Sequence, residues 1–212
     1  LLMTSGFDRY FQIAPCFRDE DARADRSPGE FYQLDMELAF ATQDDVFDVN
    51  ERVLHSIFTE FSDKSIDSIP FDRIPYKEAM AKYGSDKPDL RNPLVMQDVT
   101  ESFRGCDFKA FAGVVESGGK VITIAVKDCA SQSRKFFDDM VKFAQSVGSK
   151  GLGYLRWIDG EIQSPIAKFL SDEIIISLKE KANIENGDVM FFIADKPNKA
   201  LEIGGHVRDE LG

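Results

Sequence analysis

The sequence contains few of the residues that build disulfide frameworks and metal centres. Three of its 212 residues are cysteines and two are histidines. The cysteines are widely spaced without a Cys-x-x-Cys pair, so we expect no disulfide framework, no zinc site and no metal ligands within the chain. A reducing, cytoplasmic environment is the default for such a pattern. His55 and His206 are interpreted as structural or surface residues.

Long apolar runs and export signals are also missing. No apolar run approaches the ~18–20 residues that cross a membrane, so we expect no membrane partner. The N-terminus has no initiator methionine, no basic region and no cleavage site of a signal peptide. It resembles the middle of a longer chain, and we expect an internal fragment.

Positive charge is scarce relative to negative charge. The chain has 26 lysines and arginines against 37 aspartates and glutamates, which gives a net charge of −11. A chain with this charge repels polyanions as a whole, which argues against nonspecific nucleic-acid binding. Only a local basic patch could hold a nucleic acid. The candidates, diluted by acidic neighbours, are Arg9, Arg18, Arg23 and Arg26.

Common nucleotide and hydrolase signatures are absent. There is no Gly-x-x-x-x-Gly-Lys-[Ser/Thr] phosphate loop, and the segment from Gly151 to Gly153 lacks the third glycine of a dinucleotide fingerprint. There is no Gly-x-Ser-x-Gly elbow and no His-Glu-x-x-His zinc motif. Any nucleotide chemistry must therefore use a different scaffold.

A charged segment between two predicted strands is the most informative feature that is present. Apolar and polar residues alternate in 10–18 and in 31–38, which predicts an antiparallel hairpin joined by a polar loop with Pro28 and Gly29. The face opposite the core is either the solvated outside of a sheet or a binding surface. Its side chains are Arg18, Phe31, Gln33, Asp35 and Glu37.

The chemistry of this face suits a ligand that carries phosphates, an amine and a base. Arg18, at a strand end, can hold a phosphate or carboxylate with its planar fork of donors. Glu20, two residues on, points to the same side and can accept a hydrogen bond from an adenine amino group. Phe31 on the neighbouring strand offers a plane on which a base can stack.

Two helices are predicted after the hairpin. Thr42 and Asp45 form a capping-box pattern at the start of a helix whose apolar stripe extends to residue 61. A shorter helix is predicted from Pro75 to Tyr83, ending at Gly84. The first helix's stripe is interpreted as core or as a contact with a partner helix.

A polar segment with two prolines, residues 85–93, is the best domain boundary, and it gives domains at 1–93 and 94–212. The second domain is predicted to be α+β, and we find no catalytic or metal-ligand cluster in it. Its predicted strands are 108–115, 121–126, 153–158 and 189–194. Its predicted helices are 131–147, capped by Ser131, then 165–169, 172–181 and one that starts near Pro197.

The chain contains Phe-Arg-Asp-Glu, then a loop, then Glu-Phe-x-Gln-x-Asp-x-Glu. This order resembles motif 2 of class II aminoacyl-tRNA synthetases. The resemblance is strongest to the bacterial aspartyl-tRNA synthetases. Nearly the whole chain shares the resemblance, although the 27–30 stretch is one residue longer than in many members. It implies an α+β fold in which part of an antiparallel-sheet catalytic domain precedes a separate α+β insertion domain, also found in amidotransferase subunits. The matching segments are 6–13, 16–26, 31–37 and 83–93.

The resemblance also implies roles for individual residues. Arg18 would be the catalytic residue, because it would bind both the α-phosphate of ATP and the α-carboxylate of aspartate. The ATP-binding residues would be Arg18, Asp19, Glu20 and Phe31. The aspartate-binding residues would be Arg18, Gln33 and Asp35. Within the 21–28 loop, the contacts to the tRNA acceptor end would be Arg23 and Arg26.

By the same resemblance, the reaction would be that of an aspartate–tRNA ligase. Aspartate attacks ATP to give aspartyl-adenylate, and the 3′-terminal adenosine of tRNA then accepts the aspartyl group, with Mg²⁺ neutralising the phosphates. Motif 1, which makes a homodimer interface, and the anticodon-binding barrel should precede residue 1. Motif 3 should follow residue 212. We therefore expect the chain alone to be inactive.

Three alternatives stay open at this stage. One is a form that charges both aspartate and asparagine tRNAs. Another is a noncatalytic module whose second domain binds tRNA or an amidotransferase, although 94–212 shows no basic stripe. The third is a paralogue that makes an amino-acid amide, which the intact tRNA-facing loop disfavours.

Overall fold

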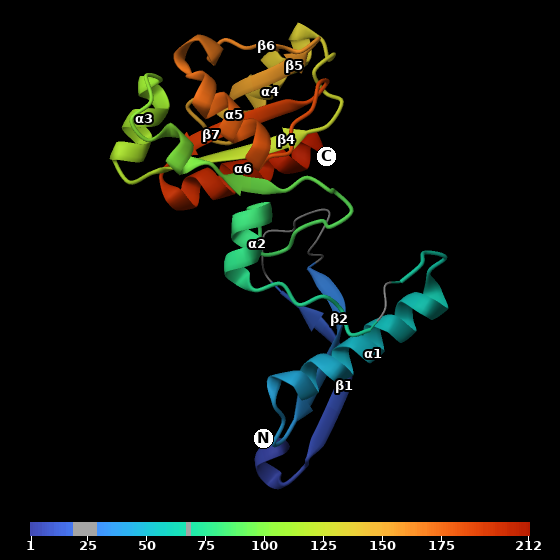
Figure 1. Cartoon of the computed structure of the whole chain (residues 1–212). Coiled ribbons are helices and arrows are strands. Elements are labelled where there is room, and N and C mark those ends of the chain that lie inside the picture. The colour runs from blue at the N-terminus through green and yellow to red at the C-terminus, as the bar shows by residue number, and fades with distance from the viewer. Residues whose placement is uncertain (19–28, 67–68) are drawn as a thin grey trace. The chain divides into compact units, whose positions relative to one another are not determined.

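The computed structural model describes residues 1–18, 29–66 and 69–212 (Figure 1). The chain divides into two compact units, Leu1–Arg73 and Ile74–Gly212, and each is described by itself. The sequence-based boundary lies later, at residue 93. The difference arises because residues 74–93 make their contacts within the second unit. Helices and antiparallel sheets are mixed, as the predicted α+β class requires.

The first unit is a hairpin followed by a long helix. Strands β1 (Arg9–Phe17) and β2 (Glu30–Leu38) pair antiparallel, after a short 3₁₀ helix at Met3–Ser5, and α1 spans Gln43–Phe61. Both strands and the helix confirm the sequence prediction.

The predicted capping box at the start of α1 is present. The Thr42 hydroxyl accepts a hydrogen bond from the Asp45 backbone N–H, and the Asp45 carboxylate accepts one from the Thr42 N–H at 2.8 Å. These two bonds satisfy donors that a helix N-terminus otherwise leaves without partners. They also lower the pKa of the Asp45 carboxyl, with the bond from the Thr42 backbone as the main cause.

No described residue of the first unit is buried. The apolar face of the hairpin is largely open: Phe11 is 69% exposed and Phe17 is 73% exposed. Between this face and α1 lies an open cavity of about 550 Å³, with Leu34, Met36 and Val53 in its lining.

The second unit contains a five-stranded antiparallel sheet in the order β3-β4-β7-β5-β6 (Figure 1). Its strands are β3 (Met96–Asp98), β4 (Lys120–Val126), β5 (Gly153–Ile158), β6 (Glu161–Gln163) and β7 (Val189–Asp195). Its α-helices are α2 (Tyr76–Tyr83), α3 (Lys109–Glu116), α4 (Arg134–Ser146), α5 (Asp172–Lys181) and α6 (Pro197–Leu211). Short 3₁₀ helices span Thr100–Phe103 and Ala167–Phe169.

Two apolar clusters, one on each face of the sheet, form the core of this unit. The central strand β7 supplies alternate residues to them: Phe191 joins the cluster with α4 and α6, and Phe192 joins the cluster with α3 and α5. Both phenylalanines are fully buried. Burial on both sides of β7 accounts for the unbroken apolar run in its sequence.

Three details of the second domain differ from the sequence prediction. Residues 108–115 were predicted to be a strand, but 109–116 form α3. The buried positions Phe111, Ala112 and Val115 follow helical spacing, which an almost continuous apolar run conceals. Ser133, not Ser131, caps α4 by accepting a hydrogen bond from the Phe136 N–H. Two edge strands of three residues each, β3 and β6, were not predicted.

No helix in the described part of the chain is long and apolar enough to cross a membrane.

Candidate functional site

The polar face of the β1–β2 hairpin brings together the residues singled out from the sequence. The register places Gln12 opposite Asp35, Ala14 opposite Gln33 and Cys16 opposite Phe31. Side chains that lie opposite one another in an antiparallel pair project from the same face. The predicted grouping of Phe31, Gln33 and Asp35 on one face is therefore confirmed by the register.

Arg18 joins this face at the end of β1. Its backbone N–H donates to the Gly29 carbonyl at 2.9 Å, which continues the ladder one residue beyond the strand. Its guanidinium carbon lies 5.2 Å from the centroid of the Phe31 ring, within the range of a cation–π contact. Arg18 is exposed and Phe31 is half-buried, so the guanidinium keeps donors directed to solvent.

Amide and carboxylate groups occupy the middle of the same face. Gln12 Nε2 donates to Asp35 Oδ2 at 3.1 Å. Gln33 Oε1 lies 3.9 Å from Cys16 Sγ, a distance at which the thiol is a weak donor. Ala14, opposite Gln33, has a small side chain.

This arrangement can hold a ligand that carries both signs of charge. Arg18 supplies a cation with several donors, and Asp35 supplies an anion two positions along β2 from Gln33. Phe31 supplies the aromatic plane beside the cation. Phosphate and carboxylate groups match the Arg18 cation, an ammonium group matches the Asp35 carboxylate, and a base or sugar matches the Phe31 ring.

Four residues predicted from the sequence lie outside the described residues: Asp19, Glu20, Arg23 and Arg26. Their expected contacts with ATP and tRNA stay predictions. Among the described residues, no group of three or more His, Cys, Asp or Glu side chains could hold a metal ion.

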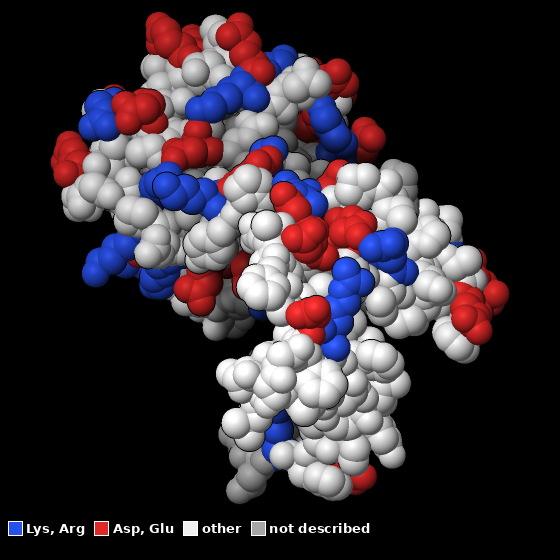
Figure 2. All heavy atoms as spheres, turned by 90° about the horizontal axis from the view of Figure 1, so that it is seen from below, with Lys and Arg blue, Asp and Glu red and all other residues white. Residues whose placement is uncertain are grey.

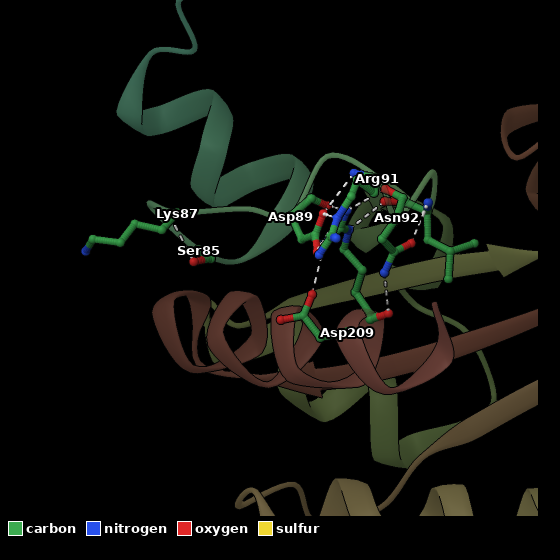
Figure 3. Close-up of polar contacts among 8 residues, drawn as sticks. Ser85, Lys87, Asp89, Arg91, Asn92 and Asp209 are labelled. Carbon is green, nitrogen blue, oxygen red and sulfur yellow. Dashed lines mark hydrogen bonds and ion pairs between the residues drawn. The ribbon is translucent and has the colours of Figure 1, made fainter. Parts of the chain in front are cut away.

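A second polar cluster, centred on Arg208 of α6, was not found from the sequence (Figure 3). The Arg208 side chain is fully buried. Its guanidinium donates to three backbone carbonyls, those of Leu94 at 2.6 Å, Asp89 at 2.9 Å and Asn92 at 2.7 Å. Asn92 Nδ2 in turn donates to the Arg208 carbonyl at 2.9 Å. Arg208 therefore fixes the backbone of the 84–94 segment.

The exposed side of this segment carries its own ion pair. The guanidinium and backbone N–H of Arg91 both donate to the Asp89 carboxylate, and these bonds lower the pKa of Asp89 to about 2. Ser85 Oγ accepts from the Lys87 N–H at 3.1 Å (Figure 3). The two prolines of this segment identified it as a domain boundary in the sequence. No local pattern in α6 indicates that Arg208 binds its backbone.

The surface charge is mixed in sign. Over the face drawn in Figure 2, lysine and arginine side chains are interspersed with carboxylates, and no broad patch of one sign covers it. This face therefore offers no broad positive patch for nonspecific attraction of a polyanion.

The chain is similar to known proteins over nearly its whole length. The family model described as tRNA synthetases class II (D, K and N) matches residues 1–203. The Aspartate--tRNA(Asp/Asn) ligase of Rickettsia bellii (strain OSU 85-389) is 57% identical over 212 residues, which cover 100% of this chain and 35% of that protein. The ligase of the same name from Rickettsia prowazekii (strain Madrid E) is 54% identical over 213 residues, with the same coverage.

The chain spans about a third of the length of these curated relatives, 35% in both cases. Among solved structures, the hypothetical protein PH0730 from Pyrococcus horikoshii OT3 is 25% identical, with a TM-score of 0.34. The match covers 44% of this chain and 50% of that one. A TM-score this low supports no statement about a shared fold.

Proposed function

The chain belongs to the class II tRNA synthetases (D, K and N), and from this premise we propose that it is part of an aspartate–tRNA ligase. The family implies an ATP-dependent reaction whose other substrates are an amino acid and a tRNA. Aspartate is favoured as the amino acid because relatives 54–57% identical over the full chain carry that name.

The proposed reaction has two balanced steps. A carboxylate oxygen of aspartate attacks the α-phosphorus of ATP, the bond to the leaving pyrophosphate breaks, and aspartyl-adenylate forms. A ribose hydroxyl of the 3′-terminal adenosine of tRNA then attacks the aspartyl carbonyl carbon, loses its proton and releases AMP. Both steps need charged groups held in line, so catalysis consists mainly of positioning and electrostatic stabilisation.

The observation that carries the proposal is the polar face of the hairpin, on which the register places Phe31, Gln33 and Asp35 together with Arg18 beside them, its guanidinium carbon 5.2 Å from the Phe31 ring centroid. We assign the α-phosphate of ATP and the aspartate carboxylate to Arg18, because its planar fork can bind both through paired hydrogen bonds. We assign the adenine ring to Phe31, and the ammonium group of aspartate to the side chains of Gln33 and Asp35. For a base to stack on Phe31, the guanidinium must move off the ring face.

The remaining assignments rest on the family resemblance alone. We propose that Asp19 and Glu20 contact ATP and that Arg23 and Arg26 contact the tRNA acceptor end. Mg²⁺ would neutralise the phosphates of ATP, although the described residues contain no metal-ligand cluster that could hold it. We also propose that residues 94–212 are the insertion domain and that the complete protein is a cytoplasmic homodimer.

The names of the relatives favour a second, broader specificity. Both are called ligases for tRNA(Asp/Asn), so we propose that aspartate is attached to asparagine tRNA as well. The test uses the complete polypeptide that carries these residues and transcripts of aspartate tRNA and asparagine tRNA. It measures the attachment of labelled aspartate, asparagine or lysine to each transcript. We expect aspartate alone to be attached, and to both tRNAs. Charging with asparagine or lysine but not aspartate would contradict the proposed function.

Substitutions on the hairpin test the assignment of each substrate. Phe31→Leu removes the aromatic plane and should raise KM for ATP by about 5- to 100-fold, the range for loss of one base-stacking contact, with little effect on KM for aspartate. Phe11→Leu makes the same change on the apolar face of the same hairpin and should alter neither KM. If Phe31→Leu and Phe11→Leu change KM for ATP equally, Phe31 does not bind the base.

A further inference from the structure

Gln12 lies directly opposite Asp35 in the β1–β2 register. Opposed residues in an antiparallel pair have Cβ atoms about 4.5–5.5 Å apart, so the strand ladder itself holds the two side chains together. Gln12 Nε2 donates to Asp35 Oδ2 at 3.1 Å. Within the described part of the chain, Asp35 Oδ1 accepts no hydrogen bond, so one oxygen is fixed and the other can receive a ligand.

The chemistry of an amide suits this position. A lysine or arginine opposite Asp35 would neutralise the carboxylate and compete with any ammonium group that approaches it. A carboxylate there would repel Asp35, because like charges directly opposite one another destabilise a strand pair. The Gln12 amide is a neutral donor, so it orients Asp35 while leaving its negative charge for a cation.

The neighbouring position on this face carries a small side chain. The next residue on this face of β1, Ala14, lies opposite Gln33 and projects only a methyl group. Gln33 is flanked by the Gln12–Asp35 pair on one side. On the other side it is bordered by Phe31 and the guanidinium of Arg18.

From this geometry we infer that Gln12 is a positioning residue, which orients the Asp35 carboxylate toward the ammonium group of the amino-acid substrate. The inference rests on the proposed function, because Asp35 meets that ammonium group only if the hairpin binds aspartate. Gln12 acts through Asp35 and touches none of the reacting atoms.

The test is steady-state pyrophosphate exchange by the complete polypeptide with Gln12→Met, which keeps the side-chain length and removes the donor. We expect KM for aspartate to rise about tenfold. This is the low end of the effect expected for losing a hydrogen bond to a charged group, because Gln12 is exposed to solvent. KM for ATP and the melting temperature should stay unchanged. The matched control is Gln43→Met, since Gln43 is an exposed glutamine at the start of α1.

Gln12→Glu supplies a second measurement, because it keeps the shape and places a carboxylate against Asp35. We expect a larger rise in KM for aspartate than with Gln12→Met. If Gln12→Met leaves that KM unchanged, or raises both KM values alike, the inference is overturned.

Asp35→Asn separates the failure of this inference from failure of the proposed function. If Asp35→Asn raises KM for aspartate while Gln12→Met does not, the binding site stands and the role of Gln12 is wrong. If Asp35→Asn leaves KM for aspartate unchanged, the aspartate pocket itself is misassigned and the inference fails with it.

Discussion

The guanidinium carbon of Arg208 lies 5.0 Å from the centroid of the Tyr83 ring, so the last helix of the chain is tied to the end of α2. The same guanidinium donates to three backbone carbonyls of the 84–94 segment while it is fully buried. Arg208 thus replaces the water that these carbonyls would otherwise need.

Arg208→Met should destabilise the second unit. The substitution retains much of the apolar stem but removes the donor that three backbone carbonyl oxygens share, which costs about 3 kcal/mol in free energy of unfolding. Urea denaturation of the wild-type and variant chains measures this difference. Arg134→Met is the control, because the Arg134 side chain is 94% exposed and its loss should have little effect. Equal stability of the two variants would contradict the role assigned to Arg208.

Gly205 of α6 should not tolerate alanine. A Cβ on Gly205 would lie 2.9 Å from the carbonyl oxygen of Gly84 and 3.0 Å from its Cα, and backbone atoms cannot move aside as a flexible side chain can. Gly205→Ala should therefore lower the melting temperature and cost about 1–3 kcal/mol, as overpacking does.

Gly113→Ala is the matched control for this prediction. Gly113 also lies inside a helix, α3, but a Cβ there meets nothing within 4 Å. Alanine should therefore raise stability by up to ~1 kcal/mol through helix propensity. Thermal unfolding of both variants should give shifts of opposite sign, and a loss of stability in both would contradict the close approach of α6 to Gly84.

Asp89 should titrate well below an ordinary aspartate. Hydrogen bonds from the Arg91 side chain, and next from its backbone, lower the pKa of Asp89 from 3.8 to about 2. Because the folded-state pKa is depressed, the stabilisation is complete above about pH 4 and is lost as the pH falls through about 2. An NMR titration of the Asp89 carboxyl carbon measures the value. Arg91→Gln should return the pKa toward 3.8, and a wild-type value near 3.8 would contradict the ion pair.

Local patterns in the sequence were sufficient to predict the hairpin and the side chains that share its polar face. Alternation in both strands determines which side chains share a face, and the register Cys16–Phe31 and Gln12–Asp35 agrees with it. Thr42 and Asp45 were recognisable as a cap because the motif is contained in four consecutive residues.

Long-range relationships were not predictable in this way. Arg208 contacts backbone carbonyls more than 110 residues earlier, and nothing within α6 signals that. Glycine disfavours a helix interior, and the close approach of Gly205 in α6 to Gly84, more than 110 residues earlier, is visible only in the structure. Residues 108–115 were assigned to a strand because a short apolar run has no clear period, and tertiary packing selected the helix.

The most direct test of the proposed function is aspartate-dependent exchange of pyrophosphate into ATP by the complete polypeptide, compared with its Arg18→Lys variant. We expect aspartate-dependent exchange by the wild type. Lysine keeps the charge but loses the planar fork, so the rate in the variant should fall on the order of 100-fold. Arg9→Lys, on the same strand but opposite Leu38 on its other face, should retain exchange. Absence of aspartate-dependent exchange in the wild type, or undiminished exchange by Arg18→Lys, would contradict the account.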